Sequence, residues 1–151
     1  MQIQRVQQVQ PWIGRPETEA IEACLERNWL TEGPAAAAFR QSLGQLTGSP
    51  HISFAPNGTL GLFLALLALD LPRGSEIIIP GFTFMASASA AVFAGLKPVL
   101  IDVDPNTFSA RPEAFERAIT SRTSALMPVH IYGQAANAAE IAQLGRRRGL
   151  A

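Results

Sequence analysis

The spacing of apolar positions in the first third of the chain is helical. A helix is predicted over Pro16–Asn28, with Ile21 and Leu25 on one face, and a proline is well placed in its opening turn. A second helix is predicted over Ala35–Leu46, with Gly48 just beyond its end as a C-terminal cap. No internal repeat or low-complexity linker interrupts the sequence.

From His51 onward, short apolar runs alternate with longer helical patterns. The expected strands are His51–Ala55, Glu76–Ile79, Pro98–Val103 and Ser124–Val129, and the expected helices are Gly58–Leu69, Thr83–Ala94, Pro112–Ile119 and Ala136–Arg148. Strands that alternate with helices over short loops indicate βαβ units. The continuous apolar runs are typical of strands covered on both faces. The fold class predicted is therefore α/β, with a mostly parallel sheet and flanking helices.

In parallel sheets, ligands bind at the carboxyl ends of the strands. The strongest local signal there is Asn57-Gly58-Thr59, which joins an expected strand to an expected helix. A helix N-terminus offers free N–H groups and partial positive charge, a glycine permits close approach, and a threonine adds a hydroxyl, so the turn suits a phosphate. The alternative is an ordinary helix cap, for which asparagine and threonine are common.

The second signal is the aromatic pair in Pro80–Phe84, which follows another expected strand. A flat heteroaromatic cofactor could stack on one of these rings, although core packing explains the same pattern. The sequence contains neither a GxGxxG nor a GxxxxGK[ST] motif, which disfavours a dinucleotide or Walker-type site.

Composition excludes several classes of function. Twelve basic and twelve acidic residues give zero formal charge, which argues against nucleic-acid and anionic-membrane partners. One cysteine forbids an intrachain disulfide, and two histidines provide no zinc cluster, so no metal is expected. The N-terminus Met1–Arg5 has no apolar leader, and the longest apolar stretch is too short to span a bilayer, so a cytoplasmic location is expected. Charged residues make up only 16%, which is typical of a piece of a larger protein with faces that another segment or subunit covers.

Six blocks, in order and spacing, resemble the DegT/DnrJ/StrS family of sugar aminotransferases. These are Trp29–Pro34, Asn57–Thr59, Pro80–Phe84, Pro98–Asp104, Ala118–Thr123 and Pro128–Gln134. The resemblance implies the large domain of a fold-type-I enzyme that uses pyridoxal 5'-phosphate (PLP) and is active as a homodimer. It also implies an amino-acid donor, usually glutamate, and a nucleotide-linked keto sugar as the substrates. We therefore expect an N-terminal helical segment over residues 1–48 and the first part of the PLP-binding domain over 49–151.

Carried over by position, the resemblance places Asn57, Gly58 and Thr59 at the cofactor phosphate and Phe84 against the pyridine ring. His130 falls on a strand that lines the cofactor pocket, and the alternative for it is a buried structural histidine. Two aspartates in a matching block, Asp102 and Asp104, are interpreted as caps of loop N–H groups. Thr31 and Gly33 match a loop near the active site, with no role assigned.

The resemblance also implies functional residues beyond Ala151. In the family, an aspartate that pairs with the pyridine nitrogen and the Schiff-base lysine follow further along the chain, so no catalytic residue is expected within these 151 residues. The one lysine, Lys97, should lie where a strand begins, at the end of the sheet opposite the ligand. The expectation is thus the N-terminal part of an aminotransferase, inactive alone, without the rest of the large domain or the small C-terminal domain. Two alternatives stay open: a non-catalytic module that binds a phosphorylated ligand, and a relative of the PLP- or PMP-dependent sugar dehydratases.

Overall fold

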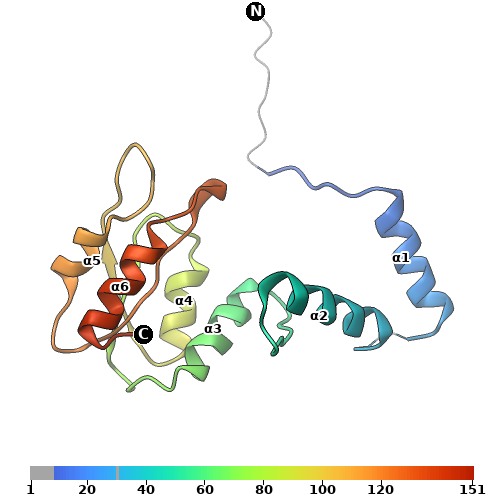
Figure 1. Ribbon diagram of the computed structural model, residues 1–151, viewed down its shortest axis with the longest axis horizontal. Helices are drawn as coiled ribbons and strands as arrows, with labels where there is room; N and C mark the ends of the chain where they lie inside the picture. The colour runs from blue at the N-terminus through green and yellow to red at the C-terminus, as the bar shows by residue number, and fades with distance from the viewer. Residues whose placement is uncertain (1–8, 30) are drawn as a thin grey trace, which may run out of the picture. The chain divides into compact units, whose positions relative to one another are not determined.

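The chain forms two compact units, Met1–Ser53 and Phe54–Ala151, each described here by itself (Figure 1). The computed structural model describes residues 9–29 and 31–151. Met1–Arg5, where no leader was expected, and Leu30, in the first of the six blocks, lie outside the described residues.

The first unit contains helices α1 (Arg15–Glu26) and α2 (Pro34–Thr47), which confirms both helices predicted for this region. At the start of α1, the Glu17 carboxylate accepts a hydrogen bond from the Gly14 amide at 2.7 Å. Gly48 ends α2 in the left-handed conformation with φ 70°, as predicted for a C-terminal cap. Neither helix has a fully buried side chain.

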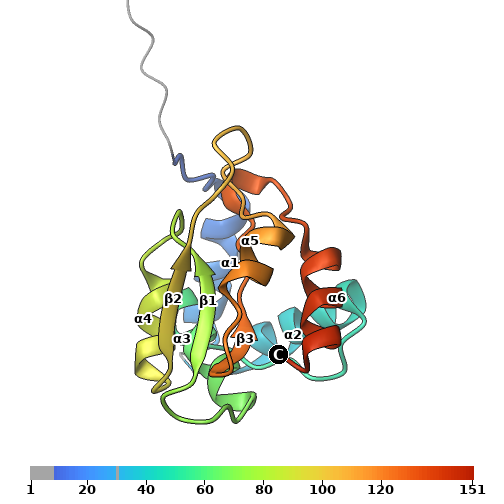
Figure 2. The same cartoon turned by 90° about the vertical axis from the view of Figure 1, so that its left-hand side faces the viewer.

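The second unit is built on a three-stranded parallel sheet of order β2-β1-β3, whose arrows point the same way in Figure 2. Its strands are β1 (Glu76–Pro80), β2 (Lys97–Ile101) and β3 (Thr123–Leu126). The central strand β1 is buried along its whole length. A buried parallel strand is covered on both faces, which explains why its isoleucines run continuously instead of alternating with polar residues.

Two helices cover each face of the sheet (Figure 2). On one face, α3 (Gly58–Ala68) and α4 (Ala86–Phe93) enclose a core with Ile77 and Ile79 of β1. On the other, α5 (Pro112–Ala118) and α6 (Ala138–Arg148) pack against Ile78. The α/β class and the parallel sheet predicted from the sequence are confirmed.

The strand predicted over His51–Ala55 is wrong, because this segment has no regular structure. A strand requires hydrogen bonds to a neighbouring strand, and none of the three strands of the sheet pairs with this segment. The helix predicted from Thr83 begins later, at Ala86, because residues 81–83 bend.

None of the helices in the described part of the chain is long and apolar enough to cross a membrane.

A buried carboxylate holds the amino-terminal edge of the sheet. Glu76, which is 5% exposed, accepts a hydrogen bond from the Thr120 hydroxyl at 2.5 Å and another from Arg122 Nε at 2.7 Å. These two hydrogen bonds hold the pKa of Glu76 below its ordinary value, and the bond from Thr120 has the larger effect. Burial acts in the opposite direction, because it raises the pKa. The cluster connects β1 to the turn that precedes β3.

Candidate functional site

Three loops meet at the carboxyl edge of the sheet, because all three strands are parallel (Figure 2). They follow Pro80 in β1, Ile101 in β2 and Leu126 in β3. The first two are joined directly, since the Gly81 amide donates to the Ile101 carbonyl at 2.8 Å. A Cβ at Gly81 would lie 3.4 Å from that carbonyl oxygen, which is an ordinary van der Waals contact.

The N-terminus of α3 carries the predicted phosphate turn. Asn57 is the N-cap, and its side-chain oxygen accepts a hydrogen bond from the Leu60 amide at 3.0 Å. Within residues 9–29 and 31–151, the Gly58 and Thr59 amides and the Thr59 hydroxyl have no hydrogen-bond partner. No atom lies within 4 Å of the position that a Cβ on Gly58 would take. Free donors beside open space are what a phosphate requires.

The direction of α3 places this turn on the side of the strand ends. The helix runs toward the loop that leads into β1, so its N-terminus lies away from the end where β1 begins. It packs along α4, which descends from the carboxyl edge. The cap interpretation of Asn57 is confirmed, and it leaves the donors of Gly58 and Thr59 free for a ligand.

Phe84 is 77% exposed, so the alternative of core packing is wrong for this ring. Its backbone is nonetheless held firmly. The Ser87 amide donates to the Phe84 carbonyl at 3.1 Å, and the hydroxyls of Ser87 and Thr83 are hydrogen-bonded at 2.8 Å. An exposed aromatic ring on a fixed backbone is available for stacking against a flat ligand.

His130 follows β3 without belonging to it, which corrects the expectation that it lies on a strand. It precedes the short 3-10 helix η1 (Ile131–Gly133) and is exposed, so the alternative of a buried structural histidine is wrong as well. Its Nδ1 accepts a hydrogen bond from the Ala136 amide at 2.9 Å. In the neutral imidazole this bond leaves the proton on Nε2, which is then a hydrogen-bond donor.

A cluster of three aromatic rings connects the loops, and sequence reasoning missed it. Phe82 follows β1, Phe108 follows β2 and Tyr132 follows β3, and we call them the aromatic trio. The ring centroid of Phe82 lies 5.4 Å from that of Phe108 and 6.0 Å from that of Tyr132. The centroids of Phe108 and Tyr132 are 6.2 Å apart. The available signal was an aromatic residue in each post-strand loop, but only the fold shows that the three touch.

Asp102 and Asp104 cap loop amides, which confirms the structural interpretation of both. Asp102 accepts from the Val103 amide, and Asp104 accepts from the amides of Asn106 and Thr107 and pairs with Arg111. These interactions keep the pKa of Asp104 below its ordinary value, and the hydrogen bond from the Asn106 amide has the largest effect.

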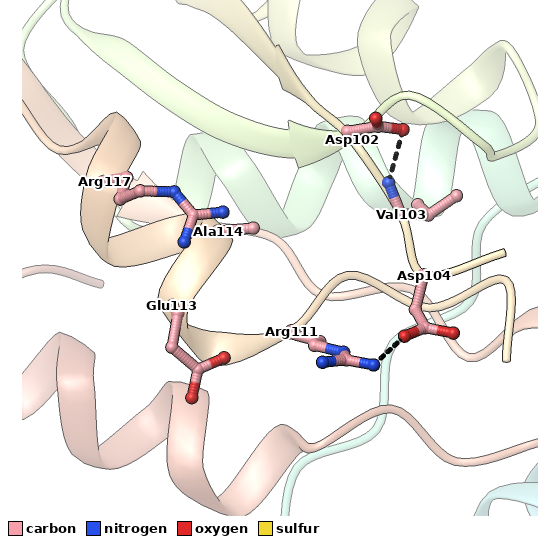
Figure 3. A pocket seen from close by; sticks show the side chains of 7 residues that line it. All are labelled: Asp102, Val103, Asp104, Arg111, Glu113, Ala114 and Arg117. Atoms are coloured by element: carbon pink, nitrogen blue, oxygen red, sulfur yellow. Dashed lines mark hydrogen bonds and ion pairs between the residues drawn. The ribbon is translucent and has the colours of Figure 1, made fainter. Parts of the chain in front are cut away.

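Beside these caps is an open cavity of about 410 Å³. It is lined by Asp102, Val103, Asp104, Arg111, Glu113, Ala114 and Arg117 (Figure 3). Three carboxylates and two guanidinium groups line it, and the buried carboxylate of Asp104 is already paired with Arg111. The cavity therefore lacks the strong excess of one sign of charge that would mark an anion or cation site.

Lys97 is the first residue of β2 and is paired in register with Glu76. It therefore lies at the amino-terminal edge of the sheet, as predicted, and away from Phe84 and His130. The predicted turn at Gly58, the Phe84 ring and His130 share the opposite end, although no hydrogen bond or ring contact among the described residues joins them to one another.

A sequence model of the DegT/DnrJ/EryC1/StrS aminotransferase family matches residues 11–151. An aminotransferase from Psychrobacter cryohalolentis is 31% identical with a TM-score of 0.87, over 93% of this chain and 36% of that chain. NtdA from Bacillus subtilis, solved with bound PMP, is 31% identical with a TM-score of 0.84, over 91% and 33% of the two chains. DesI, solved in the presence of its TDP-sugar product, is 34% identical with a TM-score of 0.73, over 88% and 34%.

The chain thus spans about a third of the length of the structures that it matches. The fold also extends to a dehydratase, the GDP-4-keto-6-deoxy-D-mannose-3-dehydratase of E. coli with bound hydrated PLP, at 24% identity and a TM-score of 0.84. At that identity only the fold is shared.

Proposed function

The chain belongs to the DegT/DnrJ/EryC1/StrS aminotransferase family, and on this premise we propose that it is the N-terminal part of a PLP-dependent enzyme that transfers an amino group to a nucleotide-linked keto sugar. The observation that carries the proposal is the extent of the family match. It runs over residues 11–151 and so includes Asn57–Thr59, Phe84 and His130. An amino acid, in the first instance glutamate, is the proposed donor.

Pyridoxal phosphate is the cofactor, as the PMP bound to the 31% identical Bacillus subtilis protein indicates. The residues present fit its phosphate. Two free amides and a hydroxyl at Gly58 and Thr59 are donors, and the positive end of the α3 dipole favours an anion. Asn57 contributes by capping the third amide, which keeps the first turn of the helix regular.

Phe84 and His130 are the proposed contacts of the cofactor ring. When bound, pyridoxal phosphate supplies the electron sink for amino transfer. The exposed Phe84 ring would cover one face of the pyridine and exclude water from it. His130 would present its Nε2 proton as a hydrogen-bond donor, because the Ala136 amide already occupies Nδ1.

The chain itself would hold and orient the cofactor without performing the covalent step. Its lysine is at the wrong edge of the sheet, so the proton-shuttling lysine must come from a segment outside these residues. We propose that this segment belongs to the same, longer protein, which works as a homodimer in the cytoplasm. A nucleotide-linked sugar as substrate is supported by the TDP-sugar product of DesI.

The test is an amino-transfer assay on the full-length protein with PLP, a panel of amino-acid donors and a panel of nucleotide-linked keto sugars. The expected result is an aminated sugar with glutamate consumed, detected by mass spectrometry. Loss of a sugar hydroxyl without gain of an amino group would indicate a dehydratase instead. Binding of phosphorylated ligands with neither product would favour a non-catalytic module.

A further inference from the structure

We propose that Phe108 is a positioning residue for the cofactor site, because its ring ties the loop that carries Phe84 to the loop that carries His130. This inference rests on the proposed function, in which those two residues contact the cofactor. Phe108 itself is far along the chain from both and belongs to neither loop.

The contacts of the aromatic trio have the required geometry. Phe82 is two residues before Phe84, and Tyr132 is two residues after His130. The Phe108 ring lies tilted by 34° against Phe82 and nearly perpendicular, at 85°, to Tyr132. Offset and edge-to-face arrangements at these centroid distances are the attractive ones for aromatic rings. The Phe108 side chain therefore braces two loops that also touch each other directly through the rings of Phe82 and Tyr132, whose centroids are 6.0 Å apart.

Phe108 is held in place from the other side by the Asp104 turn. The Phe108 amide donates to the Asp104 carbonyl at 2.7 Å, and the Asp104 amide donates to the Ser109 carbonyl at 3.0 Å. The Asp104 carboxylate caps the two amides between them. The ring thus projects from a loop that is anchored to the end of β2, which makes it a rigid support.

Two members of the trio adopt a backbone conformation that is unfavourable for aromatic residues. Phe108 has φ 56° and Tyr132 has φ 52°, both in the left-handed region. An isolated loop would avoid this conformation, so the surrounding contacts must maintain it. All three rings remain partly exposed, at 39% for Phe82, 44% for Phe108 and 65% for Tyr132, so burial in the core does not explain the strain.

The test compares PLP binding by full-length variants at Phe108 with a matched control. Phe108→Leu removes the ring and keeps apolar volume, and Phe108→Tyr keeps the ring. Phe93→Leu removes the exposed ring of a different aromatic pair, in which the half-buried Phe63 is the partner at 6.4 Å and which lies away from the post-strand loops. The readouts are the dissociation constant for PLP, the visible circular dichroism of the bound cofactor and the midpoint of urea unfolding.

Phe108→Leu is expected to weaken PLP binding by about 3- to 30-fold, because losing two ring contacts lowers the fraction of molecules with both loops in place. The circular dichroism band of the cofactor should change as well, since the loops that contact it are released. Phe108→Tyr should keep both the PLP affinity and the circular dichroism band of the parent. Phe93→Leu should lower the unfolding midpoint and leave affinity and band unchanged, which separates positioning from stability.

A comparison of Phe108→Gly with Phe108→Ala separates backbone strain from ring contact, because both variants lose the ring and only the glycine variant also relieves the strain. Phe108→Gly should therefore unfold at higher urea than Phe108→Ala and bind PLP equally weakly. If Phe108→Leu does not fold, this glycine variant and Phe108→Tyr decide the matter by the same readouts. Parent-like affinity and circular dichroism in Phe108→Leu or Phe108→Gly would overturn the inference. If Phe84→Ala also left PLP binding unchanged, the proposed cofactor site itself would fail, and the two failures are thus distinguishable.

Discussion

Thr59 contributes the one side-chain hydroxyl in the first turn of α3, next to two free amides. Thr59→Ala is expected to remove one hydrogen bond to the charged phosphate. Such a bond contributes about 1.5–3 kcal/mol, so PLP affinity in the full-length protein should fall roughly 10- to 150-fold. Thr59→Ser keeps the hydroxyl and should bind PLP nearly as well as the parent. Equal affinity of the alanine variant and the parent in a PLP titration would refute the assignment.

Phe84 is expected to contribute to PLP binding through the contact area of its ring, since it has no polar group. Phe84→Ala should weaken PLP binding by about 3- to 10-fold, the value of one aromatic stacking contact, and Phe84→Trp should be tolerated. Because the ring is already exposed, its removal should change the free energy of unfolding little. The measurement is PLP affinity beside urea unfolding. A cofactor-bound structure in which the Phe84 ring points away from the pyridine would contradict the prediction.

Glu76 makes stability depend on pH. Its pKa in the fold lies below the ordinary value of about 4.5, because the Thr120 hydroxyl and then Arg122 stabilise the carboxylate. A lowered pKa gives a contribution that is fully present above the ordinary value and is lost as the pH falls through the pKa of the folded state. The parent should therefore lose stability on acidification more steeply than Glu76→Gln, in urea unfolding at a series of pH values below 4.5. Parallel curves for the two proteins would contradict this.

At the scale of elements, the sequence predicted those whose stabilising contacts are local or repetitive. The buried isoleucines of β1 and the glycine cap at Gly48 were sufficient to identify the strand and the end of α2. The segment His51–Ala55 has the same apolar composition as a strand and is not one. Whether this segment forms a strand depends on a partner strand elsewhere in the chain, and local composition contains no information about that partner.

The candidate site divides in the same way. The turn at Asn57–Thr59 was predictable because a cap and a helix N-terminus lie within a few residues of each other. The exposure of Phe84 and the position of His130 outside β3 were not, because both depend on where neighbouring loops leave the sheet. The aromatic trio joins residues separated by up to fifty positions (Phe82 to Tyr132), which only the strand order brings together.

Helix ends and helix interiors should respond oppositely to the same substitution. Gly149 ends α6 with φ 66°, so Gly149→Ala should lower the free energy of unfolding by about 1–2 kcal/mol. Gly61 lies inside α3, where a Cβ would make an ordinary contact at 3.7 Å with Ala55. Gly61→Ala should therefore raise the free energy of unfolding by about 0.5–1 kcal/mol. Urea unfolding of both variants measures the signs. Changes of the same sign would show that one of these backbone environments is misassigned.

At the scale of the whole molecule, the apolar surface is unusually large. Only Leu66 of α3 is buried, while five other leucines of this segment are exposed: Leu60, Leu62, Leu64, Leu67 and Leu69. A helix that is apolar on all sides requires cover on all sides, and the sheet covers one. The low content of charge, at 16%, provides little compensation elsewhere. Contiguous apolar surface of this kind marks a region that another segment or subunit covers.

Residues 1–151 expressed by themselves are therefore expected to associate and to lack transaminase activity. Association follows from the exposed leucines of α3, and inactivity follows because the one lysine, Lys97, begins β2 at the edge opposite Phe84 and His130. The measurements are sizing chromatography and a PLP titration followed by borohydride reduction, with Lys97→Ala as the control. The expected results are polydisperse elution and no reducible adduct that depends on Lys97. A monodisperse monomer with such an adduct, lost in Lys97→Ala, would overturn both expectations, because it would place a reactive lysine within reach of the cofactor in a chain that needs no further cover.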